Sequence, residues 1–230
     1  MRRRTFLATT PAGGMLPGRA AHAAEPADVL LVLALDGSGS MSNERITMQR
    51  TGHAQAVASD AFIAAVLAGP KGRVALAAVE WSNQDRQTVI VPWTVIGDAE
   101  SAQRFAEALR RAPRPIPGIT SISGAIDACV AVLARAPCEA TRRVIDISSN
   151  GVNNDGRPVT DARDQAVAQG ITINGLPILD LDPTLDAYFV QSVIGGPRAF
   201  TVPASDIDSF AEALQRKLVT EIAARPVMRG

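Results

Sequence analysis

Asp36, Ser38 and Ser40 lie two residues apart on a glycine-rich segment, so that one carboxylate and two hydroxyls can act together. Carboxylate and hydroxyl oxygens are hard ligands that suit Mg²⁺, Mn²⁺ or Ca²⁺ rather than a soft metal. The intervening glycines allow the backbone to bend until the three side chains converge. The apolar run 29–35 comes directly before them and is typical of a strand buried on both faces. The pattern therefore predicts a divalent-cation site at the end of the first strand.

This pattern resembles the metal-ion-dependent adhesion site (MIDAS) of the von Willebrand factor A domain family. That site reads Asp-x-Ser-x-Ser, followed by a distant Thr and a distant Asp. Asp36, Ser38 and Ser40 match the first part, and Thr120 lies in a loop before a helix, as the family's threonine does. The resemblance extends over about residues 29–222. It implies that these four residues hold a divalent cation, with Mg²⁺ favoured over Mn²⁺ or Ca²⁺.

Position 150 departs from the family pattern, because Asn150 stands where the final Asp is expected. An amide oxygen can accept a hydrogen bond from metal-bound water, but it supplies no charge. The site is therefore either retained with Asn150 as a supporting ligand, or weakened or lost. Asp146 lies four strand residues earlier, about 13 Å away, and is expected to pair with a neighbouring donor instead. Asp155, in the following loop, remains a candidate for the missing charge.

Strand-like and helix-like segments alternate along the chain. The segments expected to be strands are 29–35, 73–80, 87–93, 144–149, 171–178 and 198–202. The segments expected to be helices are 44–67, 98–111, 122–133, 160–170, 183–189 and 205–222, with Thr160 and Asp182 as caps. The second and third strands are joined by a turn too short for a crossover, which predicts that they are antiparallel.

Strands separated by helices predict an α/β fold with a doubly wound, mostly parallel six-stranded sheet, helices on both faces and one antiparallel edge strand. The resemblance implies the same Rossmann-like architecture. Ligands of such sheets bind at the carboxyl ends of the strands, where Asp36 is expected. The expected organisation is a signal peptide (1–23), a linker (24–28), a von Willebrand factor A-like domain (29–224) and a tail (225–230).

The first 23 residues have the parts of an export signal in the right order. Residues 3–7, Arg-Arg-Thr-Phe-Leu, follow the twin-arginine pattern, and residues 21–23, Ala-His-Ala, form an A-x-A cleavage site. We expect cleavage after Ala23 and a periplasmic or secreted mature protein, with the Sec route as the alternative to the twin-arginine route. The segments 142–148 and 153–156 also resemble a bacterial subgroup of exported family members of unknown function.

Charge and hydropathy argue against general binding to nucleic acid and against a membrane-spanning segment. The chain has 23 basic and 23 acidic residues; the segment 1–23 holds four arginines and no acid, so the remainder has a net charge of −4. A mildly acidic domain has no general attraction to nucleic acid. The longest apolar run, 29–35, is far shorter than the roughly 20 residues of a membrane span.

Cys129 and Cys138 are the two cysteines, one late in an expected helix and one in the loop after it. In an oxidising compartment they could form a disulfide that pins the helix end. The alternative is a pair of buried free thiols. Both interpretations remain open.

Glu80 and Trp81 end the second strand, on the same edge of the sheet as the cation site. They are rim candidates for a wall that faces a ligand, and the alternative is an edge cap with Trp81 packed in the core. His53, alone on a helix, is expected to be structural.

These observations favour a non-enzymatic binding module whose cation binds a protein partner through an acidic side chain. The alternatives are a metal-independent scaffold with a degenerate site and, with less support, a metal-assisted phosphatase or hydrolase. A dehalogenase-like phosphatase needs a second Asp two residues after its nucleophile, and Ser38 stands there. The sequence contains no G-x-S-x-G or phosphate-loop motif, and His53 is the one histidine outside the signal. We therefore expect no enzymatic activity.

Overall fold

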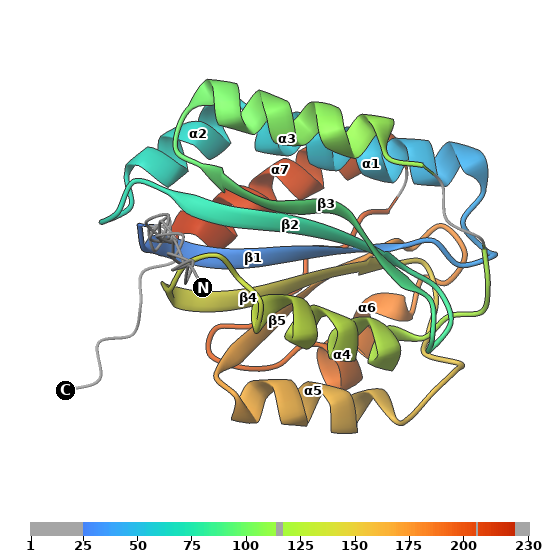
Figure 1. The fold of residues 1–230 in the computed structure, drawn as a ribbon. Coiled ribbons are helices and arrows are strands. Elements are labelled where there is room, and N and C mark those ends of the chain that lie inside the picture. The colour runs from blue at the N-terminus through green and yellow to red at the C-terminus, as the bar shows by residue number, and fades with distance from the viewer. Residues whose placement is uncertain (1–24, 114–116, 206, 224–230) are drawn as a thin grey trace, which may run out of the picture.

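The computed structural model describes residues 25–113, 117–205 and 207–223 (Figure 1). The expected signal peptide and the expected tail, 225–230, lie outside the described residues. Among the helices in these ranges, none has the length and apolar character that crossing a membrane would require. The first strand begins at Ala27, so the last two residues of the expected linker belong to the domain.

A five-stranded sheet forms the centre of the molecule, in the order β3-β2-β1-β4-β5 (Figure 1). The strands are β1 (Ala27–Asp36), β2 (Val74–Trp81), β3 (Gln87–Ile96), β4 (Ala140–Ser149) and β5 (Ile171–Pro177). β3 pairs antiparallel with β2 and the other neighbours pair in parallel. The predicted α/β class, the mostly parallel sheet and the antiparallel edge strand are thus confirmed.

The sheet has five strands rather than the six expected, because the segment 198–202 does not form a strand. Thr201 and Ala204 make isolated bridges beside β5 instead. Pro177 of β5 has no N–H to donate, so the ladder is interrupted between the bond from the Val202 N–H to the Gly175 carbonyl and the bond from the Ala204 N–H to the Pro177 carbonyl.

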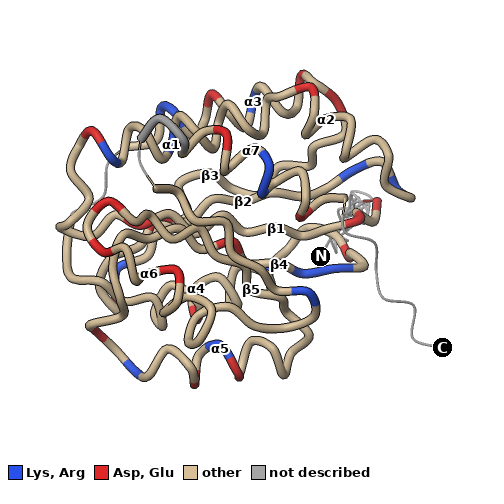
Figure 2. The backbone as a smooth tube through the Cα atoms, turned by 180° about the vertical axis from the view of Figure 1, so that it is seen from behind, with Lys and Arg blue, Asp and Glu red and all other residues tan. Residues whose placement is uncertain are grey.

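Helices cover both faces of the sheet (Figure 1). One face carries α1 (Asn43–Val57), α2 (Asp60–Leu67), α3 (Ala99–Arg111) and α7 (Ile207–Ala223). The other carries α4 (Ile122–Leu133), α5 (Val159–Ala168) and α6 (Leu185–Tyr188), which continues into a π-helical turn, Phe189–Val193. Basic and acidic residues are intermixed over the helices rather than separated by sign (Figure 2).

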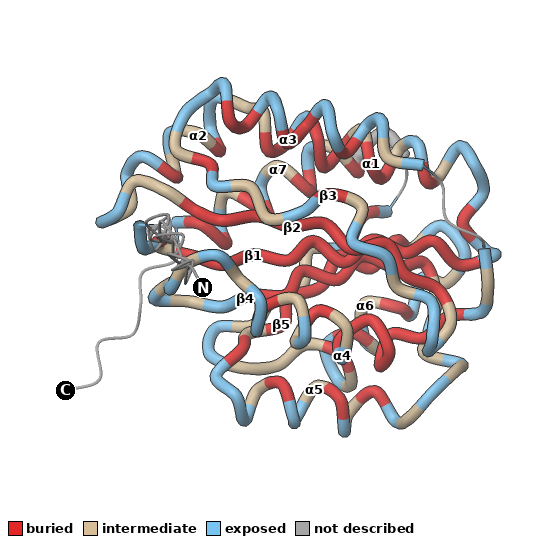
Figure 3. The backbone as a smooth tube through the Cα atoms, viewed as in Figure 1, coloured by how far each residue is buried: buried red, intermediate tan, exposed pale blue. Residues whose placement is uncertain are grey.

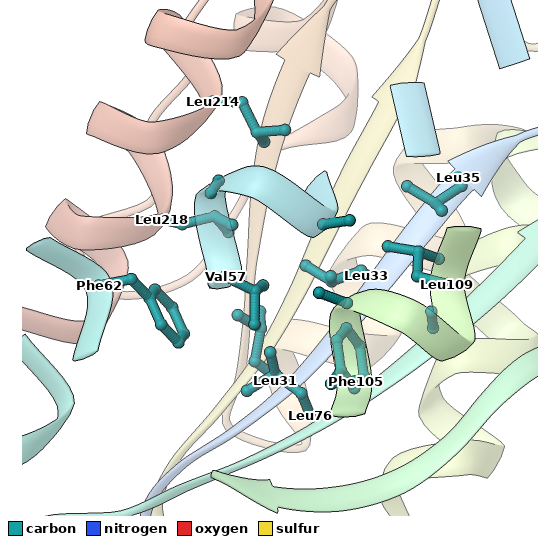
Figure 4. Packing of buried hydrophobic residues seen from close by; sticks show 14 of the residues in the cluster. Leu31, Leu33, Leu35, Val57, Phe62, Leu76, Phe105, Leu109, Leu214 and Leu218 are labelled. Atoms are coloured by element: carbon teal, nitrogen blue, oxygen red, sulfur yellow. The ribbon is translucent and has the colours of Figure 1, made fainter. Parts of the chain in front are cut away.

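The core consists of two apolar layers, one on each face of the sheet. Leu31 and Leu33 of β1 pack with Phe62 and Phe105 on the side of α1 and α3 (Figure 4). Val32, between the two leucines, packs in the layer on the side of α4 and α5. Because successive strand residues point to opposite faces, a continuous apolar run is what a centrally placed β1 needs. The burial map accordingly shows the middle of the sheet almost wholly buried (Figure 3).

Three of the expected helices differ from the structure in their bounds or caps. The expected helix 44–67 is two helices, because the Ser59 hydroxyl accepts a hydrogen bond from the Phe62 N–H at 3.2 Å and starts α2. Thr160 does not cap α5, which begins one residue earlier, directly after Pro158. Asp182 accepts the Thr184 N–H at 2.8 Å in the turn before α6 and does not open the helix itself.

Candidate metal centre

Asp36 ends β1 at the carboxyl edge of the sheet, between β2 and β4. Its side chain is buried, and its two oxygens accept the Ser38 N–H at 2.7 Å and the Ser149 hydroxyl at 2.5 Å. Burial raises the pKa of the Asp36 carboxyl, while the hydrogen bonds from Ser149 and Ser38 oppose that rise. A carboxylate taken out of water in this way is stabilised by a cation placed against it.

Ser38, Ser40 and Asn150 extend the polar line from Asp36 to the loop after β4. The hydroxyl oxygens of Ser38 and Ser40 are 3.1 Å apart, and the Ser40 hydroxyl donates to Asn150 Oδ1 at 2.8 Å. Asn150 Nδ2 in turn donates to the Ser40 carbonyl at 3.4 Å. The structure therefore places Asn150 against the serine motif.

Thr120 comes from a third loop, which precedes α4. The Gly39 N–H donates to the Gly118 carbonyl at 2.6 Å and joins this loop to the one after β1. A Cβ at position 39 would lie 3.3 Å from that carbonyl, which favours glycine there. Thr120 is held on its other side by Asn154, which exchanges two hydrogen bonds of 2.8 Å with the Thr120 backbone. The three loops that carry the predicted ligands are thus tied to one another.

The donors that these loops bring together fit a hard divalent cation. They are the carboxylate of Asp36, the hydroxyls of Ser38, Ser40 and Thr120, and the amide of Asn150. In the described ranges, no three His, Cys, Asp or Glu side chains gather as a metal site, so Asp36 would supply the charge. Oxygen-only sets of this kind suit Mg²⁺ or Mn²⁺.

Gln49 of α1 supports the site from the interior, and the sequence interpretation missed it. Its Nε2 donates to the Asp36 carbonyl at 2.9 Å, and its Oε1 accepts the Ser148 hydroxyl at 2.6 Å. The side chain is fully buried, so it fixes the end of β1 relative to β4 without contact with solvent. Its partners lie on β1 and β4, so no local spacing in the sequence marks this glutamine as buried.

Glu80 and Trp81 do not form an exposed rim, because both side chains are buried. Trp81 packs in the apolar layer on the side of α4 and α5. Glu80 accepts a hydrogen bond from Arg50 Nε at 3.1 Å and forms a buried ion pair with that arginine. β2 lies between β1 and β3 and is covered on both faces, so the end of this strand faces the interior rather than a ligand.

Asp155 is hydrogen-bonded to two neighbouring segments. Its carboxylate accepts the Gln84 N–H at 2.7 Å, and its carbonyl accepts the Ser121 hydroxyl at 2.9 Å. These contacts fasten the loop after β4 to the β2–β3 turn and to the start of α4. In the structure Asp155 thus links these segments, and its contribution of charge near Asn150 stays a prediction.

A second buried charge cluster lies between β4 and α7. Asp146 forms an ion pair with Lys217, as the expectation of a neighbouring donor required. Lys217 Nζ also lies 2.8 Å from Glu221 Oε1, which accepts a further hydrogen bond from Asn174 Nδ2 at 2.8 Å. Burial, together with the nearby charge of Asp146, raises the pKa of Glu221 to about 7. The cluster fixes α7 against the sheet, away from the candidate ligands.

Both cysteines are free thiols in the structure. Cys129 is buried in α4, and Cys138 is partly buried in the loop that follows. Burial raises the pKa of the Cys129 thiol, which keeps it protonated and unreactive. The thiol interpretation, rather than the disulfide, describes this structure.

Comparisons with known proteins agree on the fold. The family model described as "Protein of unknown function (DUF1194)" matches residues 26–226. No curated protein matches the chain. A von Willebrand factor type A protein from Catenulispora acidiphila has a TM-score of 0.59 and 17% identity, covering 85% of this chain and 43% of that one.

Two further solved structures have the same fold. The pilus adhesin SpaC from Lactobacillus rhamnosus GG has a TM-score of 0.57 and 17% identity, covering 85% of this chain and 30% of that one. Proximal thread matrix protein 1 from the mussel byssus, with a zinc-occupied MIDAS motif, has a TM-score of 0.60 and 14% identity, covering 86% and 48%. This chain spans less than half the length of each of the three. At these identities the likeness shows the von Willebrand factor A fold.

Proposed function

Because the chain belongs to the family described as "Protein of unknown function (DUF1194)" and has a von Willebrand factor A fold, we propose that it is an exported, non-enzymatic module that binds a protein partner through a divalent cation. One observation carries the proposal. Three loops at the carboxyl edge of the sheet are hydrogen-bonded to one another and bring together a buried carboxylate with hydroxyl and amide oxygens.

The residues have distinct roles toward the cation. Asp36, Ser38, Ser40 and Thr120 would hold it directly or through water, and Asn150 would orient Ser40 and accept from bound water. When bound, a Mg²⁺ or Mn²⁺ ion supplies a coordination position that a partner's carboxylate can fill. Since Asp36 is the one carboxylate among the proposed ligands, a bound divalent cation would keep a net positive charge there, which favours an anionic group from the partner.

Exposed aliphatic side chains beside the candidate ligands support a protein as the partner. Ile119 and Val152, 51% and 42% exposed, lie within two residues of Thr120 and Asn150. Leu181, in the loop after β5, is 56% exposed. Apolar side chains on the loops of a binding edge provide contact area that a lone metal–carboxylate bond lacks.

Leu181 is connected to the site through an ion pair. Its neighbour Asp180 lies 2.5 Å from Arg45 Nε, and Arg45 Nη1 donates to the Ser40 carbonyl at 3.2 Å. The loop after β5 is thereby held beside the serine motif. A partner that reaches the cation would pass over these aliphatic side chains.

A metal-independent scaffold is the second candidate, because Asn150 removes a charge that the family pattern includes. The hydrogen bonds between Ser40 and Asn150 would hold the loops together without an ion. Calorimetric titration with Mg²⁺, Mn²⁺ and Ca²⁺ separates the two candidates. Saturable binding supports the metal-dependent module, and its absence at millimolar concentrations supports the scaffold.

The partner is tested with the purified mature chain as bait in a periplasmic extract, with Mg²⁺ and with EDTA. A partner that uses the cation is lost in EDTA and with Asp36→Ala. Ile119→Ser, Val152→Ser and Leu181→Ser should weaken its capture and leave metal affinity unchanged. Leu67→Ser is the matched control, because this side chain is 55% exposed at the end of α2, and nearby Gly69 lies against Asp28 near the start of β1, at the opposite edge of the sheet.

A further inference from the structure

β3 is an edge strand of ten residues that carries no charged side chain. It lies at the end of the strand order, and within the described residues it pairs with β2 alone. An edge strand leaves a row of N–H and C=O groups that can pair with another chain, and charged side chains commonly prevent such pairing. We propose that β3 pairs with β3 of a second copy of this chain, antiparallel across a two-fold axis at Pro92, so that the protein forms a dimer.

The hydrogen-bond pattern of the sheet shows which residues of β3 face its open edge. The Ser82 N–H donates at 3.0 Å to the carbonyl of the residue directly before β3. Successive residues of β2 turn their backbone groups alternately toward β3 and toward β1, so Val79 and Ala75, an odd number of positions from Ser82, turn theirs toward β1. Their partners across the ladder, Val89 and Val95, therefore point their N–H and C=O groups away from β2.

The side chains of Val89 and Val95 lie on the same face of the sheet. Their partners Val79 and Ala75 both belong to the apolar layer on the side of α4 and α5. Since residues that lie opposite each other in an antiparallel ladder share a face, both β3 valines lie on that side as well. They are 47% and 38% exposed, so the rest of the domain does not cover them.

A two-fold axis at Pro92 brings these features of the two copies together. Val89 and Val95 lie equally far from Pro92 on its two sides, so antiparallel pairing about this residue places each valine opposite the other valine of the second copy. Their outward backbone groups can then bond to each other, and their side chains pack on one face. The same register brings Arg86 beside Asp98 of the second copy, where the charges are opposite.

Pro92 and the two register shifts beside it are features that commonly protect an edge strand. In the proposed dimer they limit the pairing to the two flanks of β3, around Val89 and Val95. Pro92, at the axis, has no N–H that would be left without a partner. The interface is therefore small, and we expect the dimer to dissociate at low protein concentration.

The dimer would present its two candidate cation sites at opposite ends. β1 and β2 end at the edge of the sheet where β3 begins, and antiparallel pairing of two β3 strands reverses the direction of the second copy. Such an arrangement could link two partners rather than one. The pairing needs no cation, so the dimer and the proposed metal-dependent function are tested separately and either can fail alone.

The test uses variants that change the facing side chains and leave the core untouched. Val89→Lys/Val95→Lys places like charges opposite each other at both positions and should weaken dimerisation by about ten-fold or more. Val89→Lys/Val95→Glu places opposite charges there and should restore much of the wild-type affinity. Val190→Lys is the matched control, since that side chain is 53% exposed beside β5, at the other edge of the sheet.

Sedimentation of the purified mature chain, from about 1 to 500 μM, measures dimerisation, and thermal unfolding confirms that each variant folds. Amide hydrogen exchange at low and high protein concentration locates the contact. The N–H groups of Val89 and Val95 should become protected as the concentration rises. Those of Thr88 and Ile96 face β2 and should be protected at every concentration.

The proposal predicts a dimer that the Lys/Lys variant weakens, that the Lys/Glu variant largely keeps, and that protects Val89 and Val95. A wild-type chain that stays monomeric at the highest concentration would overturn it, even if β3 accepts a strand from another protein. Equal weakening by the two double variants, a dimer that both leave unchanged, or unchanged exchange at Val89 and Val95 would also overturn it.

Discussion

The Ser40 hydroxyl donates a hydrogen bond to the Asn150 amide oxygen across 2.8 Å and so joins the loop after β1 to the loop after β4. The family pattern has a carboxylate at position 150, and this chain has a neutral group of nearly the same shape. This hydrogen bond joins the two loops although position 150 carries no negative charge. A carboxylate added at position 150 should therefore raise the cation affinity, and removal of the Asp36 carboxylate should lower it.

Asn150→Asp should tighten Mg²⁺ and Mn²⁺ binding by about ten-fold or more, because it places a second carboxylate beside the cation. The gain is limited because the new carboxylate must lose water. Calorimetric titration at fixed ionic strength measures it. Asn153→Asp adds the same charge in the same loop, where the Asn153 side chain accepts the Ser123 N–H at 2.9 Å, and should have a smaller effect. Equal or weaker binding by Asn150→Asp would show that position 150 does not face the ion.

Lys217→Met should lower the free energy of unfolding by about 3–5 kcal/mol at pH 7, because it leaves Asp146 and Glu221 buried without their cation. Urea unfolding followed by circular dichroism measures the change. Lys71→Met is the control, since that residue is exposed and the substitution should cost less than about 0.5 kcal/mol. If the Lys217 variant is as stable as this control, the charge cluster does not stabilise the packing of α7 against the sheet.

The stability of the domain should fall as the pH is lowered from about 6.5 toward 4, in part because of His53. Burial lowers the pKa of His53 to about 4, although a contact of 2.7 Å with the Gln49 carbonyl opposes the shift. His53 therefore takes up a proton near pH 6.5 in the unfolded chain, but only near pH 4 in the folded protein. The free energy of unfolding therefore falls by about 3 kcal/mol once the pH is below 4.

Comparison with His53→Gln isolates this effect. Lys217 and Glu221 also act on His53, and the raised pKa of Glu221 contributes the opposite slope, a loss of stability as the pH rises toward 7. Both backgrounds share that slope, so the difference between wild type and variant reports His53. Parallel stability curves between pH 7 and 4 would contradict a buried neutral histidine.

Export should remove residues 1–23, so that the mature chain starts at Ala24. Intact-mass measurement of the periplasmic fraction tests the cleavage site. Replacement of Arg3 and Arg4 by Lys should leave precursor in the cytoplasm if the twin-arginine route is used. Periplasmic protein that retains Met1 would contradict the expected processing.

The sequence predicted the parts of the molecule that depend on local spacing. The order of strands and helices follows from apolar runs and periodicity, and the ligand candidates follow from a motif of fixed spacing. The break before α2 also had a local signal, since Ser59 is a typical N-cap residue. The missing sixth strand had one as well, in Pro177, which has no N–H to donate to a neighbouring strand.

The support beneath the site had no comparable local pattern. Gln49 and Arg50 read as ordinary polar residues of a helix, and their partners lie on other elements, at Ser148 of β4 and Glu80 of β2. The direction of the Glu80 side chain likewise depends on long-range packing. A buried polar residue is paired by the tertiary fold, so its partner cannot be found from neighbours in the chain.

The central claim is that Asp36 supplies the charge of a divalent-cation site. The most direct test is calorimetric titration of wild type, Asp36→Ala and the nearly isosteric Asp36→Asn with Mg²⁺ and Mn²⁺ at fixed ionic strength, with thermal unfolding to confirm that each variant folds. We predict saturable binding by wild type and none by either folded variant. Binding by a folded Asp36 variant as tight as that of wild type would contradict the account.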